Sequence, residues 1–161
     1  MPTLGTNLIN LGPQDLALSI ALALPGAGAN NTTGILDLQS IAPNGDAWRL
    51  GRIAVVIPAI PENTAGAGIT LQLQGAPPSL VGGVAAAAPL QPGPGAFTNG
   101  NPSQIITIAA VANGGSVATV LYFTLMFDAN GSPYQFYQVL QTVPAQVAPL
   151  GESITYAFVG A

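Results

Sequence analysis

The chain has 161 residues, of which 49% are hydrophobic and only 5% are charged, and its formal net charge is −4. Because an average soluble domain carries roughly 25% charged residues, this surface must be covered by uncharged polar side chains or by partner subunits. The sequence contains no histidine and no cysteine, which excludes imidazole catalysis, imidazole or thiolate metal sites, and disulfides.

The charge pattern also narrows the choice of partners. Arg49 and Arg52 are the only basic residues and form no cluster that would neutralise several phosphates, so we expect no nucleic-acid partner. Proline or polar residues, such as Pro58 and Pro89, interrupt every long apolar stretch, so no membrane-spanning helix is predicted. Met1–Leu24 lacks the basic start of a secretory signal, which predicts synthesis in a cytoplasm without export.

Strand-like patterns recur along the whole chain. In Leu16–Leu24, large apolar residues alternate with Ala or Ser, which is the period of a strand. Leu and Ala also favour helix, but Pro25-Gly26 ends the segment early, so we favour the strand. Strands are predicted at Leu16–Leu24, Gly34–Gln39, Trp48–Ile57, Ile69–Gln74, Gln104–Ala112, Val117–Phe127, Gln135–Val143 and Glu152–Val159.

These eight short strands predict an all-β fold, a β-sandwich or jelly roll of about eight antiparallel strands in one domain spanning residues 1–161. Ile53–Ile57 and Val120–Met126 are apolar on both faces, which is typical of strands in the middle of a sandwich or covered by a second chain. Asn113–Gly115 and Asp128–Gly131 tolerate positive φ and are predicted to form tight hairpin turns.

Two uncharged or nearly uncharged segments lie outside this pattern. Met1–Gln14 is predicted to be an extended N-terminal arm, and the Gly-, Pro- and Ala-rich stretch Gly75–Gly100 is predicted to be a long loop that docks onto a neighbouring subunit. Asn30 and Asn31 begin glycosylation sequons and are interpreted as loop residues. The candidate interface residues are Leu4, Leu8, Ile9, Leu11, Arg49, Arg52, Val84, Leu90 and Phe97.

No motif in the sequence supports catalysis or a cofactor. Ser116 lies in a Gly-rich turn without a histidine to activate it. Asp128 and Asn130 resemble the start of a calcium loop, but the later ligand positions lack acids. A carboxylate pair remains a formal possibility, and its candidates are Asp37, Asp46, Glu62, Asp128 and Glu152. We therefore expect a protein that is not an enzyme and has no cofactor or metal.

The aromatic residues leave one binding function open. Exposed rings on a sheet can form a carbohydrate-binding platform, whereas rings inside strand patterns usually pack in the core, which is the interpretation we favour. The aromatic residues concerned are Trp48, Tyr122, Phe123, Tyr134, Phe136, Tyr137, Tyr156 and Phe158.

The order of these segments resembles that of a known family. Gly51–Pro58 and Gly68–Gln74 resemble the front half, and Leu125–Val143 and Gly151–Val159 the back half, of the jelly-roll cement (decoration) proteins on tailed-bacteriophage heads. This resemblance implies homotrimers on the capsid exterior that bridge major capsid proteins. The chain departs from the family where its members often carry Arg or Lys, here Gln135 and Gln138.

Two other functions fit the same residues. A carbohydrate-binding adhesion module of a virion would occur in few copies and bind glycans. A self-assembling shell or tail protein would polymerise when it is expressed alone.

Overall fold

The computed structural model describes residues 19–37, 52–60, 68–76, 80–81, 84–85, 97–100, 104–108, 117–127, 131, 134, 136–145 and 151–159. These residues form strands and short connections, and no α-helix occurs among them. They therefore contain no helix that is long and apolar enough to cross a membrane.

Twelve strands make up the described part of the chain. They are β1 (Ile20–Ala23), β2 (Asn30–Thr32), β3 (Leu36–Asp37), β4 (Arg52–Ile57), β5 (Ile69–Ala76), β6 (Leu80–Val81), β7 (Val84–Ala85), β8 (Thr98–Asn99), β9 (Ile105–Ile108), β10 (Thr119–Thr124), β11 (Phe136–Thr142) and β12 (Ser153–Val159). Each of the eight predicted strands overlaps one of them.

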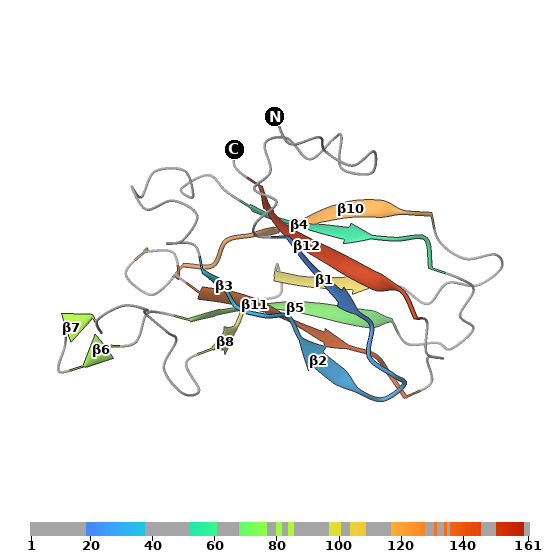
Figure 1. Cartoon of the computed structure of the whole chain (residues 1–161), viewed down its shortest axis with the longest axis horizontal. Coiled ribbons are helices and arrows are strands. Elements are labelled where there is room, and N and C mark those ends of the chain that lie inside the picture. Colours follow the sequence, from blue (N-terminus) through green and yellow to red (C-terminus); the bar gives the residue numbers. More distant parts are fainter. Residues whose placement is uncertain are drawn as a thin grey trace.

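Ten of the strands form two antiparallel sheets that lie face to face (Figure 1), and β6 and β7 form a separate two-stranded sheet. The first sheet has the order β1-β12-β4-β10. The second has the order β2-β11-β5-β8, with β3 also paired to β11 and β9 also paired to β5. The pairing is nested along the chain, because β1 pairs with β12, β2 and β3 with β11, β4 with β10, and β5 with β9. The prediction of an all-β, two-sheet sandwich is confirmed.

A single apolar cluster fills the space between the sheets. Alternate residues of β4 and β5 are buried in it, as the period of a strand requires: Ile53, Val55 and Ile57 from one sheet and Ile69, Leu71 and Leu73 from the other. The rings of Phe123, Tyr137 and Tyr156 complete the cluster. The prediction that strand aromatics pack in the core is confirmed for these three.

The strands that flank the two predicted hairpin turns do not pair with each other in the described part of the chain, and the turn residues Asn113–Gly115 and Asp128–Asn130 lie outside that part. Asn113–Gly115 lies between β9 and β10, and Asp128–Gly131 lies between β10 and β11, yet within the described residues β10 pairs only with β4 of the first sheet, whereas β9 and β11 belong to the second. Both connections therefore cross between sheets. The expected positive φ is found at Gly131, where it is 77°, and the Tyr134 N–H donates to Met126 O at 3.2 Å across that turn.

The loop assignments need two corrections. Asn30 and Asn31 belong to strand β2, whose backbone pairs with Leu140–Thr142. The stretch Gly75–Gly100 contains regular structure, since β5 continues to Ala76, β6 pairs with β7, and β8 pairs with β5. The predicted N-terminal arm, Met1–Gln14, lies outside the described residues.

The glycine at position 75 is required because the side chain of Tyr134 packs closely against it. A Cβ atom added to Gly75 would lie 2.6 Å from Cδ2 of Tyr134. The aromatic ring thus lies directly over the backbone of β5, where only glycine leaves room for it.

Candidate functional site

The residues that catalysis would need do not come together in the described part of the chain. Asp37 pairs through its backbone with Phe136 of the second sheet, whereas Glu152 precedes β12 of the first. No group of three or more Asp or Glu side chains that would hold a metal ion occurs among the described residues. Ser116, Asp46, Glu62, Asp128 and Asn130 lie outside those residues.

The most buried polar contact joins the two sheets through the core. Gln141, which is 0% exposed, donates from Nε2 to the hydroxyl oxygen of Tyr156 at 2.9 Å. Its Oε1 atom is buried without a hydrogen-bond partner. Burial raises the pKa of the Tyr156 hydroxyl, and the Gln141 bond opposes this rise only in part. The pair holds strands together and supplies no group that titrates near neutral pH.

A second buried tyrosine has the same structural character. The Tyr137 hydroxyl donates to the backbone oxygen of Met126 at 2.8 Å and so ties β11 to the end of β10. Desolvation by burial raises the pKa of Tyr137, while its backbone hydrogen bonds oppose the rise. Nearby, Thr33 Oγ1 accepts from the backbone N–H of Val139 at 2.9 Å. These contacts fix strands and leave no proton donor poised at a surface.

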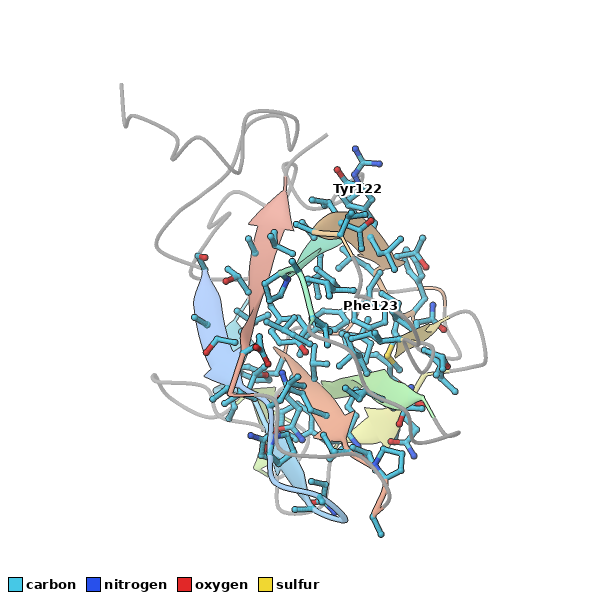
Figure 2. The ribbon with its side chains drawn as sticks, turned by 90° about the vertical axis from the view of Figure 1, so that its right-hand side faces the viewer. Tyr122 and Phe123 are labelled. Atoms are coloured by element: carbon cyan, nitrogen blue, oxygen red, sulfur yellow. The ribbon has the colours of Figure 1, made fainter. Side chains whose placement is uncertain are left out.

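The outer face of the first sheet carries a separate apolar cluster, which we call the β4–β10 patch and define as Arg52, Val56, Val120 and Tyr122. Val56, Val120 and Tyr122 pack over Ala54, which is fully buried although it lies outside the core cluster. The guanidinium carbon of Arg52 lies 4.0 Å from the centroid of the Tyr122 ring. Figure 2 shows Tyr122 pointing away from the sandwich, while its neighbour Phe123 points into the core.

The outer face of the second sheet carries a row of amide side chains that are bonded to one another. Gln138 of β11 donates from Nε2 to Oε1 of Gln74 on β5 at 2.7 Å. Gln74 in turn donates from Nε2 to Oδ1 of Asn99 on β8, also at 2.7 Å. These three side chains are direct cross-strand neighbours, so the bonds form a ladder across three strands.

A pocket of about 240 Å³ lies between β8, the residue before β9 and the residues that follow β10. Its lining combines apolar, aromatic and uncharged polar residues: Thr98, Asn99, Gly100, Gln104, Met126, Phe127 and Tyr134. The Phe127 side chain is 56% exposed, whereas Gln104 is held by a bond from its Nε2 to Oγ1 of Thr124 at 3.2 Å. None of the lining residues carries a charge, so the chemistry of the pocket suits a neutral ligand.

Three of the nine candidate interface residues fall within the described part of the chain. Arg52 is exposed on the outer face of the first sheet, Val84 belongs to the short strand β7, and Phe97 is half-buried beside β8. The other six lie outside the described residues: Leu4, Leu8, Ile9, Leu11, Arg49 and Leu90. The three described candidates therefore lie in three different parts of the structure: β4, β7 and the residue before β8.

Sequence reasoning missed the contact that defines the β4–β10 patch. Arg52 and Tyr122 are far apart in the chain, and they meet because β4 and β10 pair with Arg52 opposite Thr124, two residues from Tyr122. A diagonal cross-strand pair of long side chains is within reach. The strand predicted at Val117–Phe127 implies that Tyr122 and Phe123 point to opposite faces. It does not indicate which strand pairs with this one.

No protein-family model, no curated protein and no solved structure matches this chain.

Proposed function

We propose that the protein is a capsid cement (decoration) protein of a tailed bacteriophage. In this proposal the chain forms one jelly-roll domain over residues 1–161, assembles as a homotrimer, and binds the outside of the capsid, where it bridges major capsid proteins. It is made in the host cytoplasm, has no catalytic activity, and binds neither nucleic acid nor membrane. Its work is done entirely by association.

The nested strand order carries this proposal. The first strand pairs with the last, the second with the next to last, and so on inward to β5 and β9. That order results when one long antiparallel ribbon is rolled into two facing sheets, which is the plan of a jelly roll, a common fold of viral capsid domains. It supports the resemblance to cement proteins that the strand segments suggest. A fold alone does not define a function, so the surface chemistry must agree with it.

The surfaces agree with a role in binding a particle. The second sheet presents the amide ladder of Gln138, Gln74 and Asn99, and the first presents an apolar patch with a single cation. Exposed ion pairs are weakened by salt, because the Debye length falls to about 3 Å at 1 M ionic strength. Contacts made by apolar and amide groups persist in varying salt, as a clamp on a particle under internal pressure requires.

Binding to heads that lack the protein tests the proposal. The purified protein is mixed with such heads at about 0.1 M and about 1 M salt, and bound copies are counted by gel densitometry while head rupture is followed during heating. We expect many copies per head at both salt concentrations and a higher rupture temperature. A protein that stays free, or binds without changing the rupture temperature, rejects the function as proposed.

The pocket lined by Phe127 favours a second candidate, a carbohydrate-binding module. An exposed aromatic ring beside amide and hydroxyl groups is the usual lining for a neutral sugar. Phe127 would stack on the sugar ring, while Asn99 and Tyr134 would bond its hydroxyls. A glycan array probed with the parent protein and the Phe127→Ala variant separates the two candidates, since only the adhesion module binds glycans and loses them with the ring.

A further inference from the structure

We propose that the β4–β10 patch is the surface that docks onto the major capsid protein, and that it receives a carboxylate of that protein within an apolar frame. This inference rests on the proposed cement function and adds to it the docking face and the chemistry of the partner.

The patch holds one cation, the Arg52 guanidinium, in a fixed position. Arg52 is exposed and its guanidinium stacks on the Tyr122 ring at 4.0 Å, so its position is fixed without consuming its hydrogen-bond donors. No described carboxylate pairs with it, and it is the one basic side chain in the described part of the chain. A guanidinium held in this way is suited to a two-pronged bond with a carboxylate.

The residues around Arg52 have the composition of a binding surface. Val56 and Val120 form an apolar floor over the buried Ala54, next to an arginine and a tyrosine. Arginine and tyrosine are enriched among the residues that dominate interface affinity, and charged residues are otherwise depleted at interface centres. The patch therefore has an apolar centre with one specific polar group.

The patch lies at an edge of the first sheet. β10 is the terminal strand of the first sheet, and among its residues Thr119–Thr124 there is no charge and no proline. Proteins usually protect such edges with charges, prolines or covering segments. Leu121 of this strand is 40% exposed, but it lies opposite the core residue Val55 and so faces the other side of the sheet from Val120 and Tyr122. The outward-facing residues Val120 and Tyr122 therefore place the patch directly at this edge, where a partner that covers the patch also reaches the strand.

Charge complementarity favours a different protein over a second copy in the same orientation. A two-fold interface would place the same patch on both sides. Two patches face to face would bring two copies of Arg52 into an apolar contact, and no described residue of the patch would neutralise them. A patch with one cation and no anion is complementary to a surface that presents an anion.

Equilibrium binding to heads that lack the protein tests the role of Arg52. We expect Arg52→Ala to weaken binding at least tenfold, because truncating one partner of a desolvated charge pair leaves the other unpaired. Arg52→Lys should give an intermediate loss, since lysine keeps the charge without the two-pronged geometry. Gln138→Ala, on the opposite face of the sandwich, is the matched control and should bind as the parent does.

Cross-linking gives a readout that does not depend on affinity. A photoreactive benzophenone amino acid replaces Val120 in the patch or, as a control, the exposed Thr107 on the outer face of the second sheet. We expect a cross-link to the major capsid protein from position 120 only. If the parent protein does not bind heads at all, the cement function itself fails.

If the parent binds but Arg52→Ala binds equally well, the docking role of this patch is overturned. A cross-link from position 120 only to a second copy of this chain overturns it as well and assigns the patch to self-association.

Discussion

Replacing the buried pair Gln141 and Tyr156 tests whether polar contacts in this core contribute stability or only geometry. Tyr156→Phe removes the oxygen that accepts the 2.9 Å bond from Gln141 Nε2, and Gln141 is then left with Oε1 unpaired and only a 3.5 Å contact from Nε2 to Leu22 O. An unsatisfied buried polar group costs about 1–3 kcal/mol. We therefore expect Tyr156→Phe to lower the free energy of unfolding by about that amount.

The double variant Gln141→Leu with Tyr156→Phe should recover this loss. It replaces both polar groups with apolar ones of similar shape and also removes the unpaired Oε1, a change that is often neutral or stabilising. Urea unfolding followed by circular dichroism measures all four proteins of the cycle, with equal m values as the check on two-state behaviour. Gln138→Leu combined with Tyr156→Phe is the control and should be additive, because Gln138 lies on the outer face. Additive effects for the Gln141 pair would refute the reasoning.

Three further predictions follow from packing and burial. Gly75→Ala should destabilise the protein by about 1–3 kcal/mol through overpacking, whereas Gly26→Ala, which has open space around its Cβ, should change stability by about 1 kcal/mol or less in urea unfolding. Phe123→Ala should cost about 3–5 kcal/mol, measured by thermal unfolding, because the ring is fully buried. Burial raises the folded-state pKa of Tyr137 and Tyr156 above 10.0, so the unfolded state loses protons first. The tyrosine contribution to the free energy of unfolding should therefore be constant below about pH 10 and fall above it, by up to about 1.4 kcal/mol per pH unit for each tyrosine. In urea unfolding, each Tyr→Phe variant should remove the contribution of one tyrosine to this pH dependence.

Alternation of apolar and polar residues was enough to predict most of the strands and which side faces the core. Ile69, Leu71 and Leu73 are buried as the period of two requires, and Ile154 and Tyr156 are buried in the same way. The prediction succeeds because one face of each strand lies against the other sheet, so every second residue is buried and apolar. Strand β2 escaped detection, because Asn30–Thr32 has no apolar residue and is a strand only through its backbone pairing with β11.

Pairing partners were not predictable from local sequence. A Gly- or Asn-rich turn has the same composition whether it joins two paired strands or carries the chain from one sheet to the other. Asn113–Gly115 was therefore expected to form a hairpin, although β9 and β10 belong to different sheets. The Arg52 and Tyr122 contact was missed for the same reason, since it depends on which strand lies beside β4.

In the proposed function, the two outer faces of this weakly charged chain have different roles. On the second sheet, Gln138, Gln74 and Asn99 bond one another across three strands, which leaves their remaining amide groups to water without any ion that salt would screen. On the first sheet, apolar side chains surround one fixed cation beside a terminal strand, β10, that has no charge and no proline. The amide side chains are hydrated favourably by water, whereas on the apolar face Arg52 is the side chain that water hydrates well. In the proposed docking, the hydrophobic effect therefore favours an orientation with the first sheet toward the capsid and the second toward solvent.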